Sequence, residues 1–160
     1  VAVSGGAAFS DHLAVVAFNE KHVSGLTLHL PAHFLVDEGK FISGHYGDIA
    51  NSLHREFSAR LGIDSLSEIA TAIKSGAEVN VNNKGFIPRN TDISNSSSFM
   101  IAFTSGFHQN SVTRFGVDPL VRDSEINDNG TRDTWSKSRR HYRIRVSNPG
   151  LLSDSQWSLF

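Results

Sequence analysis

The chain has 160 residues, of which 39% are hydrophobic, and its formal net charge is −1. This length is sufficient for one domain with a core, and the near-neutral charge disfavours nucleic acid and acidic membranes as partners. The absence of cysteine excludes disulfides and thiolate metal sites. No apolar run approaches the roughly 18 residues that cross a bilayer and no signal peptide is visible, so we expect a soluble, cytoplasmic protein without membrane contact.

The first eighteen residues predict a strand, a glycine turn and a helix. Val1-Ala2-Val3 is typical of a short strand, Ser4-Gly5-Gly6 of a turn, and the apolar run 13–18 of a helix. Ser10 is the predicted N-cap, and Asp11 lies in the first turn, where the helix dipole favours a carboxylate. Such a turn either offers free backbone N–H groups to an anion or is simply a tight connection.

The next segments predict a βαβ unit followed by a helix. Residues 26–30 alternate as a second strand, which Pro31 ends because it cannot donate to a ladder. Residues 32–46 suggest loops. Residues 48–61 predict an amphipathic helix with Gly62 at its C′ position. Its apolar residues recur every four positions: Ile49, Leu53, Phe57 and Leu61.

The second half of the chain is more irregular. Asp64 opens a predicted helix that ends at Gly76, residues 77–81 predict a short edge strand, and residues 80–98, with Gly85 and Pro88, suggest a surface loop. The apolar run Phe99–Phe103 predicts a parallel strand covered on both faces. A helix over residues 131–142 and a final strand over 142–146 follow.

Three polar turns have the main-chain amides and small hydroxyls that bind a nucleotide phosphate. They are Ser4-Gly5-Gly6, Thr104-Ser105-Gly106, and Gly130-Thr131 with Thr134. In an open parallel sheet, ligands bind beyond the carboxyl ends of the strands. Asp11 either orients a ribose hydroxyl or caps its helix. The other predicted contacts to a nucleotide or nucleotide-derived ligand are Ser4, Gly5, Gly6, Thr104, Ser105, Gly106, Gly130, Thr131 and Thr134.

The order of these motifs resembles the SLOG superfamily, the DprA/SMF and LOG group of Rossmann-like nucleotide-binding domains. Its small bacterial and phage branch has SGGAxGxDxLA, a PAxW-like strand end, GxxAGxxRN, an AFxxG strand end and a GTxxT helix start. The counterparts here are Ser4-Gly5-Gly6-Ala7, Pro31-Ala32-His33-Phe34, residues 39–44, residues 102–106, and Gly130-Thr131 with Thr134. The resemblance implies an α/β fold, a three-layer Rossmann-like sandwich with a mainly parallel sheet.

This sequence departs from the family pattern in several places. The family's first strand would lie upstream of Val1, so we expect either processing or a longer parent polypeptide. No arginine–asparagine pair is evident after the GxxAG counterpart, where Asp48 and Asn51 lie. We assign the domain to residues 1–148, with insertions at about 62–98 and 107–129 and a C-terminal tail at 149–160.

The predicted function is a nucleotide-binding sensor module without catalytic residues. Enzymatic LOG members carry PGGxGTxxE, whereas residues 128–134 here lack the paired glycines and the glutamate, with Asp133 the nearby acid. One alternative is a structural or interaction subunit of a homo-oligomer or larger assembly that keeps the fold without the ligand. A second is a nucleotide phosphoribohydrolase-like enzyme, whose carboxylate would be Asp11 or Asp133.

Histidines and basic residues suggest two further sites that we do not favour. His29 and His33 straddle a strand end and a proline, so they lack the helical spacing that aligns two imidazoles on a metal. The basic cluster over residues 137–145 is more typical of a solvated surface than of a nucleic-acid contact.

Overall fold

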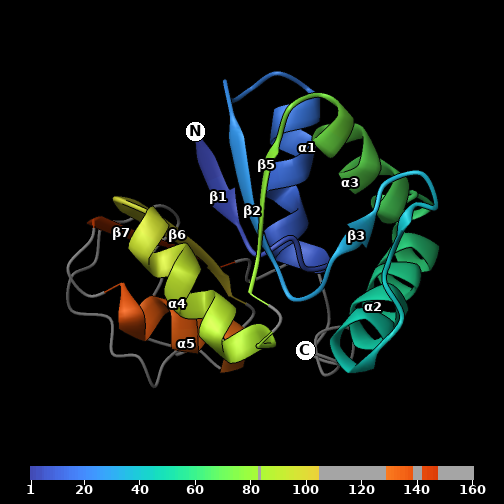
Figure 1. The fold of residues 1–160 in the computed structure, drawn as a ribbon. Helices are drawn as coiled ribbons and strands as arrows, with labels where there is room; N and C mark the ends of the chain where they lie inside the picture. The colour runs from blue at the N-terminus through green and yellow to red at the C-terminus, as the bar shows by residue number, and fades with distance from the viewer. Residues whose placement is uncertain (83, 105–128, 139–141, 148–160) are drawn as a thin grey trace. The chain divides into compact units, whose positions relative to one another are not determined.

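The computed structural model describes residues 1–82, 84–104, 129–138 and 142–147 (Figure 1). The chain divides into two compact units, Val1–Ile93 and Ser94–Phe160. The fold is α/β with parallel strand pairing in both units and is compatible with a Rossmann-like arrangement, which confirms the predicted fold class. No helix in these described ranges is long and apolar enough to cross a membrane.

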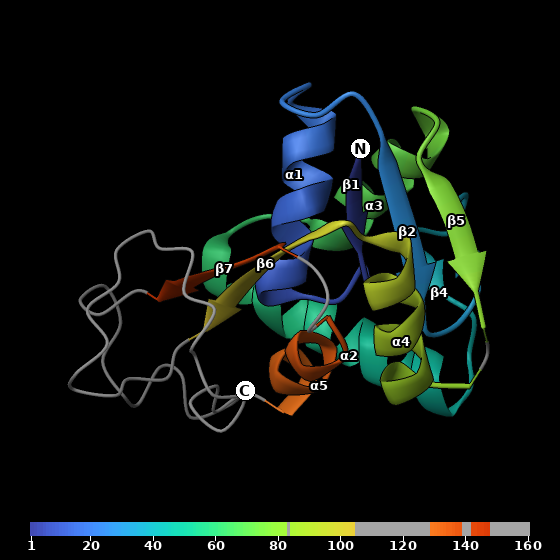
Figure 2. The same cartoon turned by 90° about the vertical axis from the view of Figure 1, so that its left-hand side faces the viewer.

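A three-stranded parallel sheet forms the centre of the first unit. Its strands are β1 (Ala2–Ser4), β2 (Leu26–Leu30) and β5 (Glu78–Val81), in the order β1-β2-β5 (Figure 2). Ser4 pairs with Leu28, and Leu28 pairs with Val79 across the next ladder. The predicted βαβ unit and the edge position of β5 are therefore confirmed.

Helices α1 (Leu13–Asn19) and α3 (Ser65–Lys74) pack against each other on one face of this sheet (Figure 1). Strand order advances in one direction from β1 to β5, so right-handed crossovers bring both helices to the same face. The apolar core lies between these helices and the sheet, and its fully buried members are Val15, Leu28, Leu30, Ile69 and Ala72. On β2, Thr27 and His29 alternate with the leucines toward the opposite, polar face.

Helix α2 (His45–Leu61) follows a small antiparallel hairpin of β3 (Phe34–Leu35) and β4 (Lys40–Phe41), where the sequence suggests only loops. The predicted apolar stripe is wrong in part, because Ile49 is 37% and Leu61 61% exposed. The helix instead buries Gly47, Ala50, Asn51, His54 and Phe57. Asn51 is buried because its amide bonds both the N–H and the C=O of Phe41, each at 2.9 Å.

Two helix boundaries agree with their sequence signals and one does not. Gly62 ends α2 in the left-handed conformation, with φ +68°, as a C-terminal glycine should. Asp64 caps α3. Ser10 is not an N-cap, because it lies inside the short 3₁₀ helix η1 (Phe9–His12), which Ala8 precedes.

The predicted surface loop over residues 80–98 is wrong, because it contains helix α4 (Phe86–Ser96). Pro88 is tolerated as the third residue of the helix, where its missing N–H would have no intrahelical partner. The buried residues of α4 are mostly polar: Arg89, Asn90, Ile93 and Ser94. An apolar periodicity therefore could not reveal this helix.

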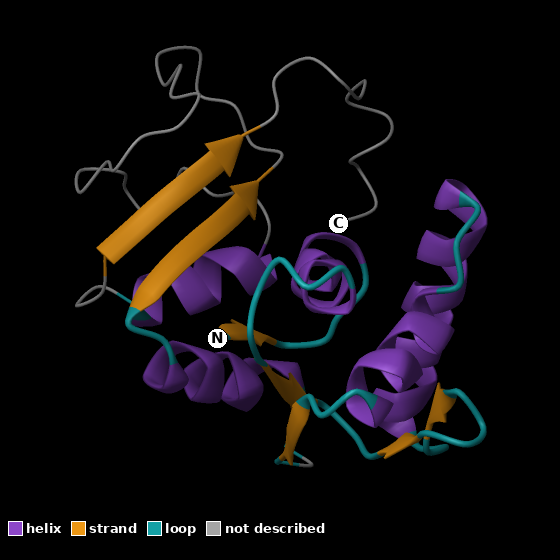
Figure 3. Cartoon of the chain, turned by 90° about the horizontal axis from the view of Figure 1, so that it is seen from above, coloured by secondary structure: helices purple, strands orange, loops and turns teal. Residues whose placement is uncertain are grey.

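The second unit pairs β6 (Phe99–Thr104) with β7 (Tyr142–Ser147) in parallel, and α5 (Asn129–Lys137) packs on β6 (Figure 3). Trp135, 1% exposed, packs with Ala102 and Met100. Contrary to the sequence prediction, the described residues do not cover β6 on both faces, since Phe99 and Ile101 are 44% and 46% exposed. The predicted tail at 149–160 lies outside the described residues.

The side chain of Asp64 is expected to stabilise the N-terminus of α3, and this can be tested by mutation. Its carboxylate accepts a hydrogen bond from the Ser67 N–H at 3.0 Å. We expect Asp64→Ala to lower the free energy of unfolding by about 1 kcal/mol in urea denaturation. Asp64→Asn keeps an acceptor and should lose much less. An unchanged denaturation midpoint for Asp64→Ala would contradict this assignment.

Candidate functional site

The carboxyl ends of β1, β2 and β5 lie at one edge of the sheet, because the three strands are parallel. Ser4-Gly5-Gly6 follows β1, Pro31 and Ala32 follow β2, and the connection to α4 follows β5. This is the edge at which open parallel sheets bind ligands. Four predicted site residues, Ser4, Gly5, Gly6 and Asp11, come together here.

The Ser4 hydroxyl organises the glycine turn. It donates to the Asp11 carbonyl at 2.8 Å and accepts from the Gly6 N–H at 3.1 Å. Gly6 has φ +58°, and a side chain there would also collide with Leu30. Of the two alternatives that the sequence leaves open, the Gly6 N–H fits the tight connection, since it is already bonded within the turn.

Arg89 of α4 is the main site residue that the sequence analysis missed. Its side chain lies against Gly5, where a Cβ would stand 2.6 Å from the Arg89 Cζ and 2.7 Å from the Asp11 Oδ2. Nη1 donates to the Gly5 carbonyl at 3.1 Å. A side chain at position 5 would force the guanidinium, the carboxylate or both to move, because both pack on the Cα of Gly5.

Arg89 is buried although it carries a charge, and its guanidinium is only partly hydrogen-bonded. Arg89 is only 6% exposed, its Nε has no hydrogen-bond partner, and its Nη2 lies 3.8 Å from the Asp11 Oδ2. Burial lowers the pKa of Arg89, and the charge of Asp11 opposes that shift. The guanidinium stays charged, so the turn carries a buried cation.

Asn90 follows Arg89 on α4, within the residues 80–98 that the sequence predicts as a surface loop. The Asn90 side chain is buried, and its Oδ1 lies 3.4 Å from the Arg89 Nη2.

A buried histidine supports the turn from α2. The His54 Nε2 bonds the Gly6 carbonyl at 3.1 Å, and its Nδ1 lies 3.0 Å from the Ser65 Oγ. Because a carbonyl only accepts, Nε2 carries the proton and Nδ1 accepts from Ser65. Burial, assisted by the neighbouring His12, lowers the pKa of His54 to about 4, although the Gly6 bond opposes the shift. His54 is therefore neutral at pH 7.

His12 lies beside this network. Its Nε2 is 2.5 Å from the Glu68 Oε2, its side chain is 1% exposed, and its Nδ1 has no hydrogen-bond partner. The rings of His12 and His54 meet edge to face at 5.8 Å. Within the described ranges, no three histidine, aspartate or glutamate side chains gather in a way that could hold a metal ion.

The other predicted contacts belong to the second unit. Thr104 ends β6, and Gly130, Thr131 and Thr134 lie in α5, where the Thr134 hydroxyl donates to the Gly130 carbonyl at 3.1 Å. Ser105 and Gly106 lie outside the described residues. Asp133 pairs with Lys137 at 2.6 Å along the helix surface.

The sequence has a relative in a giant virus. It is 38% identical over 148 residues to protein R261 of Acanthamoeba polyphaga mimivirus, described as an uncharacterized protein. The match covers 92% of this chain and 70% of the viral protein, so the chain belongs to the same family as R261. No protein-family model matches the chain, and no solved structure matches it.

His54 provides a pH test of this site. Its pKa is about 4 in the folded chain against 6.5 ordinarily, so the unfolded chain binds more protons between these values. We expect the free energy of unfolding to fall by about 3 kcal/mol from pH 7 to pH 4 through this residue, in urea titrations at successive pH.

The matched variants are His54→Gln, which should flatten the pH profile, and His22→Gln, which alters an exposed histidine and should leave it unchanged. An equally steep profile in His54→Gln and the wild type would exclude this role.

Proposed function

We propose that this protein binds a nucleotide or nucleotide-derived ligand as a sensor or binding module, with the phosphate at Arg89. The observation that carries the proposal is a buried guanidinium beside a glycine turn at the carboxyl edge of a parallel sheet. A family resemblance to SLOG domains points to the same ligand class.

The charge balance at Arg89 supports an anionic ligand. A buried charge is costly unless it is paired and hydrogen-bonded. The Asp11 carboxylate is 3.8 Å from Nη2, beyond hydrogen-bonding distance, and Nε has no partner. A phosphate oxygen would supply the acceptor that Nε lacks, and its negative charge would add to that of Asp11.

The glycine turn, Ser4-Gly5-Gly6, contributes to the proposed phosphate site by its backbone conformation more than by hydrogen bonds to the ligand. Ser4 already engages the Gly6 amide, and His54 engages the Gly6 carbonyl. These bonds hold the backbone still, while Gly5 lets the guanidinium lie directly on the main chain. Asp11 then positions Arg89 rather than a ribose hydroxyl. Contacts of a ligand with Thr104, Ser105, Gly106, Gly130, Thr131 and Thr134 stay a prediction from the composition of these turns and from the resemblance.

Calorimetry with a panel of mononucleotides and inorganic phosphate tests the proposal. We expect Arg89→Gln to weaken nucleotide binding at least tenfold, since charge-assisted hydrogen bonds contribute about 1.5–3 kcal/mol. Arg89→Lys keeps the charge without the planar fork and should lose less. Arg55→Gln, on the exposed face of α2, is the matched control and should bind normally.

Thermal melts establish that each variant is folded before binding is compared. Absence of heat with every ligand in the folded wild type would overturn the proposal. So would a folded Arg89→Gln variant that binds as tightly as the wild type.

A further inference from the structure

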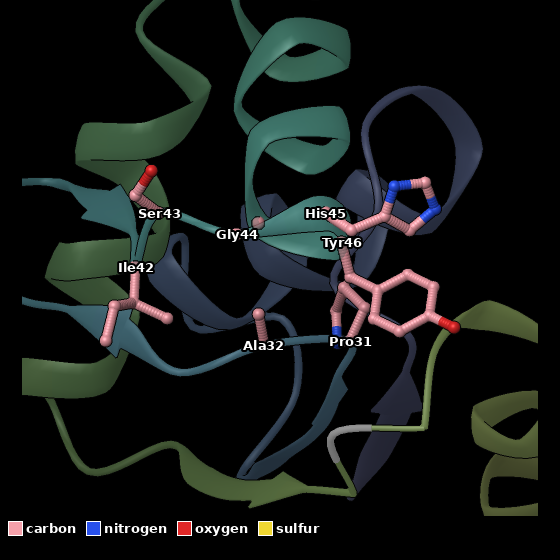
Figure 4. A pocket seen from close by; sticks show the side chains of 8 residues that line it. Pro31, Ala32, Ile42, Ser43, Gly44, His45 and Tyr46 are labelled. Atoms are coloured by element: carbon pink, nitrogen blue, oxygen red, sulfur yellow. The ribbon is translucent and has the colours of Figure 1, made fainter.

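A pocket lies at the same edge of the first unit. It has a volume of about 180 Å³ and lies between Pro31-Ala32, after β2, and residues 42–47, which lead into α2 (Figure 4). Its lining contains no lysine, arginine, aspartate or glutamate. The pocket therefore suits a neutral, partly apolar group rather than a phosphate.

The start of α2 near this pocket is already neutralised. Asp48 accepts from the Ser43 hydroxyl at 3.2 Å and from the Gly44 N–H at 3.3 Å. Its carboxylate thus occupies the positive end of the helix dipole. An anion would find neither an unoccupied helix N-terminus nor a lysine or arginine there, which separates this pocket chemically from Arg89.

Tyr46 provides an aromatic wall whose position is fixed by its neighbours. Its ring meets Phe86 edge to face at 5.9 Å and His45 at 5.0 Å. Gly85, at φ +91°, brings the backbone so close that a Cβ would stand 2.5 Å from the Tyr46 ring. The ring is half-buried, so one part packs while another borders the pocket.

Phe86 connects this wall to the buried cation. The Arg89 Cζ lies 5.3 Å from the centre of the Phe86 ring. The Tyr46 ring centre is therefore at most about 11 Å from the Arg89 Cζ, the separations of 5.9 and 5.3 Å laid end to end. This separation between the Tyr46 ring and the Arg89 guanidinium is short enough for one small ligand to contact both.

We infer that the Tyr46 pocket holds the base of a mononucleotide whose phosphate lies at Arg89, an inference that rests on the proposed function. The ligand class is one with an uncharged aromatic ring at one end and a phosphate at the other. Stacking on an aromatic side chain accommodates any base, since each has a π face.

The test compares a mononucleotide with ribose 5-phosphate, which keeps the sugar and phosphate but has no base. Calorimetry first selects the tightest of AMP, GMP, CMP and UMP. We expect Tyr46→Leu to weaken that nucleotide roughly 5- to 150-fold, the range for a lost base stack, and to leave ribose 5-phosphate unchanged. Tyr46→Phe keeps the ring and should bind both ligands as the wild type does.

Tyr46→Leu retains an apolar side chain in the packing position, and a thermal melt verifies that it is folded. Equal losses for both ligands, or no loss for the nucleotide, would overturn the inference. A wild type that binds ribose 5-phosphate through Arg89 but binds no nucleotide more tightly would overturn the inference and leave the proposed function standing. If neither ligand binds, both fail.

Discussion

The contact between Arg89 and the main chain of Gly5 is the constraint on which the site depends. It joins residues 84 positions apart and ties α4 to the end of β1. A guanidinium out of water must find acceptors, and here it has the Gly5 carbonyl, with a carboxylate nearby. A side chain at position 5 would push the guanidinium or the Asp11 carboxylate from its place. The present geometry of Arg89 therefore depends on glycine at this position.

Beside this contact the turn is held by buried polar side chains as well as by the core leucines Leu28 and Leu30. Ser4, His54 and Ser65 are all buried, and each hydrogen-bonds to another chain segment. Such fully bonded networks are rigid, because each broken bond would leave a buried polar atom unsatisfied. The leucines of β2 secure the sheet, while these polar side chains fix the geometry at its edge.

Much of the frame of the first unit was predictable because its signals are local. The alternation of residues 26–30 and the glycine at position 62 each depend on a few neighbouring residues, and each prediction is confirmed. Helix α4 and the buried face of α2 were not predictable in this way. Asn51, His54 and Arg89 are buried because they bond backbone groups of distant segments. A periodicity of apolar residues carries no information about such partners.

Asp48 has a consequence for selectivity. Its carboxylate lies in the first turn of α2, next to the Tyr46 pocket, and the Arg89 guanidinium lies beside the glycine turn. For a molecule that carries charge at one tip only, the two ends are not interchangeable, so entry in the reversed direction is penalised. Under the proposed function, the phosphate is therefore expected at Arg89 and an uncharged group near Asp48.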